Sequence, residues 1–130
     1  MPKLLVVDDE QETADFLRDF FQRFDLEVLT AATGEEALST LESEKPELVL
    51  LDIRLGKGSS GLEVLRQARV RKTQAEIVVV TAVEDRNVAD MAEGLGAAGY
   101  ITKPFVLEEL EQVVLARLKP QQRVVEEPSD

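Results

Sequence analysis

Five short runs of mainly apolar residues restrict the fold of this chain more than any other feature. The runs are Lys3–Val7, Glu27–Ala31, Leu48–Leu51, Ile77–Val80 and Gly99–Thr102. Short, continuous apolar runs are typical of parallel strands buried on both faces, and parallel strands are usually joined by helical crossovers. We therefore expect an α/β fold in which helices cover both faces of one five-stranded parallel sheet.

Apolar residues at helical spacing predict five helices, one after each of these strands. Their apolar faces comprise Leu17, Phe20, Phe21 and Phe24; Ala37, Leu38 and Leu41; Leu62, Leu65 and Ala68; Val88, Met91, Ala92 and Leu95; and Leu107, Leu110, Val114 and Leu118. Thr33 and Glu36 have the spacing of a capping box at the start of the second helix, and Asp85 provides an N-cap for the fourth. Pro46 forbids continuation of the second helix because proline lacks a backbone N–H.

Polar side chains follow four of the predicted strands. Asp8 and Asp9 follow the first strand, Asp52 the third, Thr81 the fourth and Lys103 the fifth. In parallel sheets the functional crevice lies outside the carboxyl ends of the strands, so these side chains should gather in one place. Three carboxylates repel one another unless a cation is bound, and hard oxygen ligands with room for water favour Mg²⁺. The set predicts a phosphoryl-transfer site with a carboxylate nucleophile.

Each of these side chains also has an ordinary structural interpretation. Asp8 and Asp9 could cap the first helix, and Asp52 could be a turn residue. Thr81 suits a strand in any case, and most lysines, including Lys103 when taken alone, lie at the surface. Two adjacent acids are nevertheless more than a cap requires, and the opposing Asp52 favours the functional interpretation.

Four segments at these strand ends form a recognisable combination. They are Val7-Asp8-Asp9-Glu10, Leu51-Asp52, Val80-Thr81-Ala82 and Tyr100-Ile101-Thr102-Lys103-Pro104-Phe105. Together they resemble the receiver domain of two-component response regulators, of the chemotaxis-regulator-like kind. The resemblance extends over roughly Lys3 to Leu118 and implies a receiver domain at residues 1–119. It also implies a single flavodoxin-like, doubly wound sheet of five parallel strands in the order 2-1-3-4-5, with five helices.

The resemblance implies a role for each acidic residue. Asp52 would be the phosphoacceptor and would receive a phosphoryl group from a histidine kinase. Asp9, Asp52 and the backbone carbonyl of Arg54 would bind Mg²⁺ directly, Asp8 would act mainly through water, and Mn²⁺ could substitute for Mg²⁺. The protein would not be an enzyme in the usual sense, because it would catalyse only its own phosphorylation and dephosphorylation.

The same resemblance implies that Thr81 and Lys103 hold the phosphoryl oxygens, and that Thr81 and Tyr100 form a switch. Tyr100 would turn inward when Thr81 moves towards the phosphoryl group. From the residues alone, Tyr100 could equally be an edge-strand aromatic residue packed on the last helix. Pro104 biases Lys103 towards an extended backbone and so fixes the direction of its side chain, and receivers usually have a cis peptide bond at this step.

The loop after Asp52 departs from the family pattern. Receivers commonly have a proline four residues after the phosphoacceptor and a glycine four residues further on. Here Gly56 takes the proline position, and Gly61 opens the third helix one residue late. We expect the loop Arg54–Ser60 to be longer and more permissive than usual, since glycine adopts conformations that other residues avoid.

Composition and charge limit the partners of this chain. It has 26 acidic and 15 basic residues and a net charge of −11, so we expect no direct binding to nucleic acid or to an anionic membrane. We expect a cytoplasmic protein, because the chain has no cysteine, no signal-peptide pattern and no apolar stretch near the ~20 residues that span a bilayer. Residues 120–130 are mostly polar and are expected to form a flexible tail or linker.

The expected partners are a sensor histidine kinase or phosphotransfer protein, and a downstream effector protein or domain. Two other functions stay open. A receiver-like interaction module that is not phosphorylated would share the fold, although such a module would normally have lost one of the acids or the lysine. A flavodoxin-like flavin-binding protein shares the architecture, but its first loop must hold a phosphate, which the acidic segment Asp8-Asp9-Glu10 would repel.

Overall fold

The computed structural model describes residues 1–56 and 60–118 and contains the five predicted strands and five predicted helices. The strands are β1 (Lys3–Val7), β2 (Glu27–Ala31), β3 (Leu48–Leu51), β4 (Glu76–Thr81) and β5 (Gly99–Thr102). The helices are α1 (Gln11–Phe21), α2 (Gly34–Glu44), α3 (Gly61–Val70), α4 (Arg86–Gly94) and α5 (Leu107–Leu118), and a short 3-10 turn, η1 (Gln22–Phe24), follows α1. Four strands have the predicted limits, and β4 is one residue longer at each end.

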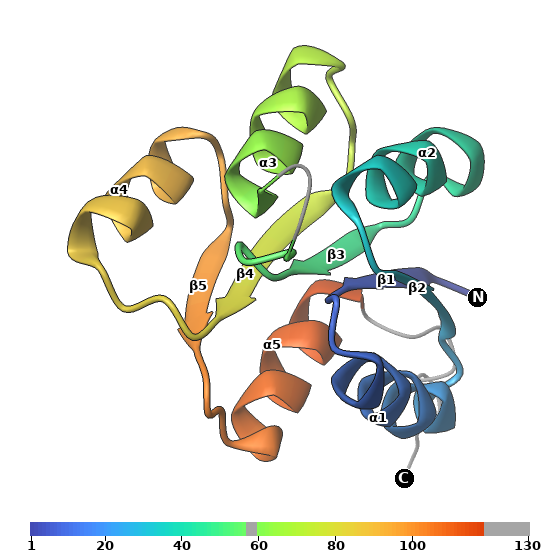
Figure 1. Ribbon diagram of the computed structural model, residues 1–130. Helices are drawn as coiled ribbons and strands as arrows, with labels where there is room; N and C mark the ends of the chain where they lie inside the picture. The colour runs from blue at the N-terminus through green and yellow to red at the C-terminus, as the bar shows by residue number, and fades with distance from the viewer. Residues whose placement is uncertain (57–59, 119–130) are drawn as a thin grey trace, which may run out of the picture.

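The strands form one parallel sheet in the order β2-β1-β3-β4-β5, which confirms the predicted order. Val7 at the end of β1 pairs with Leu51 at the end of β3, and Leu51 pairs with Val79 of β4. Because all strands run in the same direction, their carboxyl ends share one edge of the sheet (Figure 1). The residues that follow β1, β3, β4 and β5 therefore meet at that edge.

Helices cover both faces of the sheet, as expected for a doubly wound fold. Figure 1 shows α1 and α5 on one side and α2, α3 and α4 on the other. Successive strand residues point to opposite faces, so Leu4 and Val6 pack with α1 and α5, whereas Leu5 and Val7 pack with the other three helices. Every residue of β3 is buried, which places this strand at the centre of the core.

The predicted N-caps are confirmed, but the second hydrogen bond of the capping box comes from Ala32 and not from the N-cap residue Thr33. The Thr33 hydroxyl oxygen accepts a hydrogen bond from the Glu36 N–H at 3.1 Å, and the Glu36 carboxylate accepts one from the Ala32 N–H at 2.8 Å. The Asp85 carboxylate accepts a hydrogen bond from the Asn87 N–H at 2.8 Å at the start of α4. Helix α2 ends at Glu44, before Pro46.

Two details of the predicted helices are wrong. Met91, expected on the buried face of α4, is 52% exposed, because α4 is a nine-residue helix beside the edge strand and buries only Ala92 fully. The first helix gives way to the tighter turn η1 at Gln22, so Phe24 lies beyond α1 and is only partly buried. Positions 57–59 of the loop and the predicted tail at 120–130 lie outside the described residues. Within the described part of the chain, no helix is long and apolar enough to cross a membrane.

Candidate functional site

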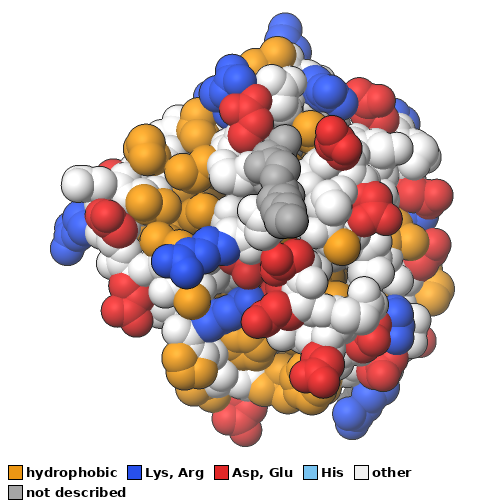
Figure 2. Space-filling model, viewed as in Figure 1, with side chains coloured by type: hydrophobic (Ala, Val, Ile, Leu, Met, Phe, Trp, Pro, Cys, Tyr) orange, Lys and Arg blue, Asp and Glu red, His pale blue; other side chains and the backbone are white. Residues whose placement is uncertain are grey.

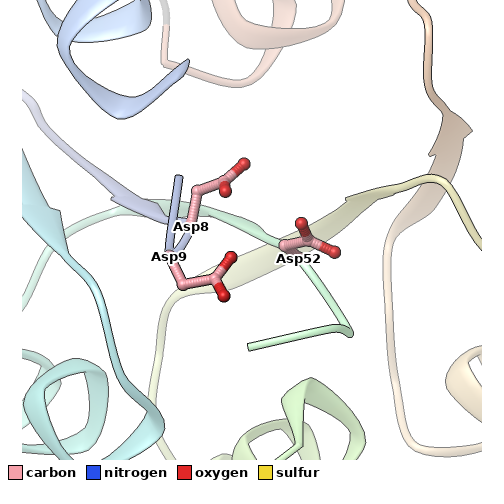
Figure 3. Close-up of side chains that lie close together, drawn as sticks. All are labelled: Asp8, Asp9 and Asp52. Carbon is pink, nitrogen blue, oxygen red and sulfur yellow. The ribbon is translucent and has the colours of Figure 1, made fainter. Parts of the chain in front are cut away.

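The ends of β1 and β3 bring the three predicted carboxylates together. The Asp8 N–H donates to the Ala31 carbonyl and the Asp52 N–H to the Val7 carbonyl, both at 3.0 Å, so each aspartate continues the pairing of its strand. Oxygen atoms of Asp8, Asp9 and Asp52 all lie within 4.8 Å of one another. Figure 3 shows the three side chains close together at the strand ends, with the Asp9 carboxylate directed towards Asp52. These oxygens fit the hard donor set that Mg²⁺ prefers.

Backbone hydrogen bonds hold the two buried carboxylates in their own turns. The Asp8 carboxylate accepts from the Glu10 N–H at 2.9 Å, and the Asp52 carboxylate accepts from the Arg54 N–H at 3.0 Å. Asp8 and Asp52 are 5% and 6% exposed, whereas Asp9 is exposed. Glu10, not an aspartate, is the N-cap residue of α1, and no side chain makes a cap hydrogen bond there. Helix capping therefore does not account for the acidic pair.

Lys103 joins the two buried carboxylates. Its Nζ lies 2.7 Å from Asp8 Oδ2 and 3.1 Å from Asp52 Oδ2. Burial lowers the pKa of Lys103, but the hydrogen bonds and charges of the two aspartates outweigh burial and raise the pKa above its ordinary value. For Asp8, burial disfavours the charged carboxylate and raises its pKa, although Lys103 and the Glu10 N–H oppose that rise. Three carboxylates and one ammonium have a formal charge of −2, which suits a divalent cation.

The backbone beside Lys103 is fixed by its neighbours. The Lys103 N–H donates to the Thr81 carbonyl at 2.8 Å. The Lys103-Pro104 peptide bond is cis, as the resemblance implied.

An open pocket of about 740 Å³ lies in front of these side chains. Figure 2 shows acidic and basic side chains next to one another near the centre of this face. The polar part of the pocket is lined by Asp9, Glu10, Asp52, Arg54 and Lys103, and the apolar part by Leu62, Ala82, Val83 and Val88. The small side chain at position 82 leaves the approach to Asp52 open.

The contacts of the Thr81 and Tyr100 hydroxyls are with the backbone of Val83. Thr81 is fully buried and does not line the pocket in this conformation; its hydroxyl oxygen accepts a hydrogen bond from the Val83 N–H at 3.4 Å. The Tyr100 hydroxyl donates to the Val83 carbonyl at 2.7 Å. The two predicted switch residues are therefore linked through the backbone of Val83.

Tyr100 packs on the side of the sheet that α2, α3 and α4 cover, not on the last helix. Burial raises the pKa of its hydroxyl, with smaller contributions from the negative charges of Asp85 and Asp52. The alternative prediction, that Tyr100 packs on the last helix α5, is therefore wrong.

The glycine at the start of α3 is explained by a close approach of two backbones. The Gly61 N–H donates to the Ile53 carbonyl at 2.7 Å. A Cβ atom at this position would collide with the Asp52 carbonyl oxygen and with Ile53. Only glycine allows α3 to begin so close to the end of β3, and the prediction that Gly61 opens this helix is confirmed.

Sequence reasoning missed three contributors to the site. Glu10 was assigned no role of its own, yet its N–H donates to the Asp8 carboxylate and its carboxylate lies 3.9 Å from Lys103 Nζ. Its place beside the acidic pair was the available signal. Val83 acts through its backbone, which no side-chain pattern reveals. Gly56 lies against Asp9, a contact that depends on the path of the loop.

A comparison with protein families identifies this arrangement. The model of the response regulator receiver domain matches residues 4–115. The chain belongs to the response regulator receiver family. Phosphorylation on an aspartate is the standard function of this family, and the receiver is a phosphoacceptor domain of two-component signalling, not a classical enzyme.

One curated relative of this receiver is a transcriptional regulator. The receiver is 40% identical over 117 residues to the alkaline phosphatase synthesis transcriptional regulatory protein PhoP of Bacillus subtilis. The match covers 90% of this chain and 48% of PhoP. The chain thus spans about half the length of that relative.

Solved structures support the same assignment. A CheY-like response regulator receiver domain protein from Methanospirillum hungatei is 28% identical, with a TM-score of 0.86 over 95% of this chain and 98% of that chain. A response regulator protein from Burkholderia pseudomallei, solved with a phosphorylated aspartic acid, a calcium ion and citrate, is 30% identical. Its TM-score is 0.79, and the match covers 91% of this chain and 66% of that chain.

Proposed function

We propose that Asp52 is the residue of this receiver that becomes phosphorylated. The observation that carries the proposal is the meeting of three carboxylates with Lys103, at a pocket that Asp9, Asp52 and Lys103 line. Asp52 is the member that directly follows the central strand and lines the pocket, with one carboxylate oxygen held by the Arg54 N–H. A nucleophile needs such a fixed position, because phosphoryl transfer depends mainly on orientation and on neutralisation of charge.

We further propose that Asp9, Asp52 and the backbone carbonyl of Arg54 bind Mg²⁺, with Asp8 acting through water and Mn²⁺ as a substitute. The spacing of the aspartate oxygens and the formal charge of the site support this ligand set. When bound, the ion would offset the repulsion between the Asp52 carboxylate and an incoming phosphoryl group.

The transfer step follows from the positions of Asp52 and Lys103. A carboxylate oxygen of Asp52 forms a bond to phosphorus while the bond between phosphorus and the donor breaks, and the leaving group departs with the electron pair. The Lys103 ammonium leaves Asp52 Oδ2 and neutralises charge on the phosphoryl oxygens. Attack of water on phosphorus later releases phosphate and restores the carboxylate, so the domain catalyses only its own phosphorylation and dephosphorylation.

Thr81 and Tyr100 would transmit the change. When the Thr81 hydroxyl turns to the phosphoryl oxygens, it gives up its 3.4 Å contact with the Val83 N–H. The Val83 carbonyl accepts a hydrogen bond from the Tyr100 hydroxyl. A shift of the Val83 backbone would therefore weaken or break this hydrogen bond. The edge formed by α4 and β5 would thereby respond to chemistry at Asp52.

The partners follow from this function. The phosphoryl donor would be a sensor histidine kinase or a phosphotransfer protein in the cytoplasm, and the phosphorylated form would act on a downstream effector protein or domain. The net charge of −11 argues against direct binding of this chain to nucleic acid. We propose that the receiver unit comprises residues 1–119 and that residues 120–130 form a linker or tail.

Incubation with acetyl phosphate and Mg²⁺, followed by intact-mass measurement, tests the assignment of Asp52. One added phosphoryl group is expected for the wild type, and none after removal of Mg²⁺ or in Asp52→Asn. Asp90→Asn is a matched control, since Asp90 is an exposed aspartate outside the site, and it should be labelled like the wild type. Persistence of the label in Asp52→Asn would contradict the proposal.

A further inference from the structure

Gly56 lies directly against one of the three site carboxylates. It is four residues beyond Asp52 and lines the same pocket. Its φ of +66° is in the left-handed region. Glycine adopts this conformation readily and asparagine does so less often, whereas most other residues avoid it. A Cβ atom at this position would stand 2.8 Å from Asp9 Oδ2 and 3.8 Å from Asp9 Cγ. A separation of 2.8 Å is too short for a carbon and an oxygen that are not bonded.

Asp9 differs from the other two aspartates in how it is held. Asp8 and Asp52 each accept one hydrogen bond from a backbone N–H and one from Lys103. Asp9 is exposed, and its carboxylate makes no hydrogen bond or ion pair with any residue in the ranges 1–56 and 60–118. Figure 3 nevertheless shows its carboxylate turned towards Asp52. Within the described residues, the direction of the Asp9 carboxylate therefore depends on the free space beside Gly56 and not on a hydrogen bond.

We propose that Gly56 is a positioning residue for the metal ion, and that it acts by leaving room for Asp9 to face the other two carboxylates. The inference rests on the proposed role of Asp9 as a metal ligand. A side chain at position 56 and the present direction of Asp9 exclude one another. A protein with a Cβ at position 56 relieves the collision by turning the carboxylate of Asp9 away, because that carboxylate is the mobile end of its side chain. The turn removes one oxygen from the set that gathers within 4.8 Å.

The proposal also explains why this loop cannot follow the usual pattern. Proline fixes φ near −65°, whereas the observed φ at Gly56 is +66°. The backbone at Gly56 requires glycine for two reasons: its φ is positive, and a Cβ atom there would collide with Asp9. The metal site of this receiver depends on a residue that contributes no ligand atom.

Direct measurement of metal affinity tests the proposal without any phosphorylation. Mn²⁺ binding is followed through the electron paramagnetic resonance signal of the free ion, and Mg²⁺ binding by calorimetry. Gly56→Ala should raise the dissociation constant by about 10- to 100-fold, the usual effect of disturbing the groups that orient a metal ligand. Gly94→Ala is the control, because a Cβ at Gly94 meets nothing within 4 Å, and it should bind both ions like the wild type.

A second variant separates the missing Cβ from the backbone angle. Asparagine tolerates positive φ better than alanine but adds the same Cβ, so Gly56→Asn should lose metal affinity as strongly as Gly56→Ala. Circular dichroism confirms that each variant is folded before titration. Wild-type affinity in either Gly56 variant would overturn the proposal, since both add the colliding atom.

A double-mutant cycle with Asp9→Asn completes the test. If Gly56 acts through Asp9, Gly56→Ala should change affinity less than about twofold in the Asp9→Asn background, because interacting residues are not additive. Independent, additive losses would overturn the proposal. Wild-type metal affinity in Asp9→Asn would instead show that Asp9 is not a ligand, which removes the proposed ligand set as well. Weak binding in Asp9→Asn together with normal binding in Gly56→Ala would overturn only the role of Gly56.

Discussion

The two halves of the site are held with different firmness. In the half built on β1 and β3, the carboxylates of Asp8 and Asp52 are buried, and each accepts hydrogen bonds of 2.7–3.1 Å from a backbone N–H and from Lys103. Towards the β5 edge of the sheet, the Thr81 hydroxyl is buried but has only a 3.4 Å contact. Strand β5 has no buried residue, and α4 buries only Ala92.

Under the proposed function, this difference would place the phosphoryl-transfer groups at the centre of the sheet and the switch residues towards its β5 edge. Phosphoryl transfer requires groups that keep their geometry, and the central strands provide them. A switch requires two arrangements of similar free energy, and segments with few buried contacts open at low cost. The sheet therefore places a rigid centre beside an adaptable edge, and the carboxyl ends of the strands connect the two.

The largest effect should come from the core of the rigid half. Leu50→Ala removes a side chain that is 2% exposed, and it should lower the free energy of unfolding by about 2–5 kcal/mol. Ile101→Ala in β5 should cost clearly less, because Ile101 is only partly buried. Urea unfolding of both variants measures the comparison, and equal losses would show that the two halves are equally well packed.

A second effect concerns the charges of the rigid half. Mg²⁺ at a hundredfold excess over its dissociation constant should stabilise the wild type by about 2.7 kcal/mol. Asp9→Asn should melt at a higher temperature than the wild type without metal, because it removes one of three neighbouring like charges, and it should gain less from Mg²⁺. Thermal unfolding with and without Mg²⁺ measures both effects. A lower melting temperature of metal-free Asp9→Asn would mean that Asp9 stabilises the fold in another way.

The smallest effect should come from the adaptable half. Tyr100→Phe deletes the hydrogen bond to the Val83 carbonyl and should cost about 0.5–1.5 kcal/mol. Amide hydrogen exchange should become faster in the segment after β4 and in β5, while β1 and β3 stay protected. Faster exchange across the entire sheet would argue against a separate, adaptable edge.

Much of the fold could be predicted from the sequence because the strands are continuous apolar runs. The residues alone did not establish the order of the strands, since the choice of neighbours depends on contacts between distant segments; the order came from the family resemblance. Helical spacing indicated the side of α4 on which Met91 lies. It could not show that α4 lies beside the edge strand of the sheet, where Met91 stays exposed.

The candidate site could be predicted as far as the strand ends determine it. Asp8, Asp9, Asp52 and Lys103 meet because parallel strands end at one edge. The link through Val83 was missed because it uses only backbone atoms. The contact between Gly56 and Asp9 was missed because it depends on a backbone angle and a loop path that no local pattern specifies.

The bridge that Lys103 makes between Asp8 and Asp52 gives the site a charge balance with a consequence beyond catalysis. Three carboxylates and the ammonium total −2, and a divalent ion in the proposed place brings the total to zero. Conversion of the Asp52 carboxylate into an acyl phosphate of about −2 charge leaves one uncompensated negative charge. Groups able to respond to this charge include the side chain of Arg54, which lines the same pocket, and the hydroxyl dipole of Thr81. We infer that this uncompensated negative charge attracts the Thr81 hydroxyl and so favours the second arrangement of the β5 edge.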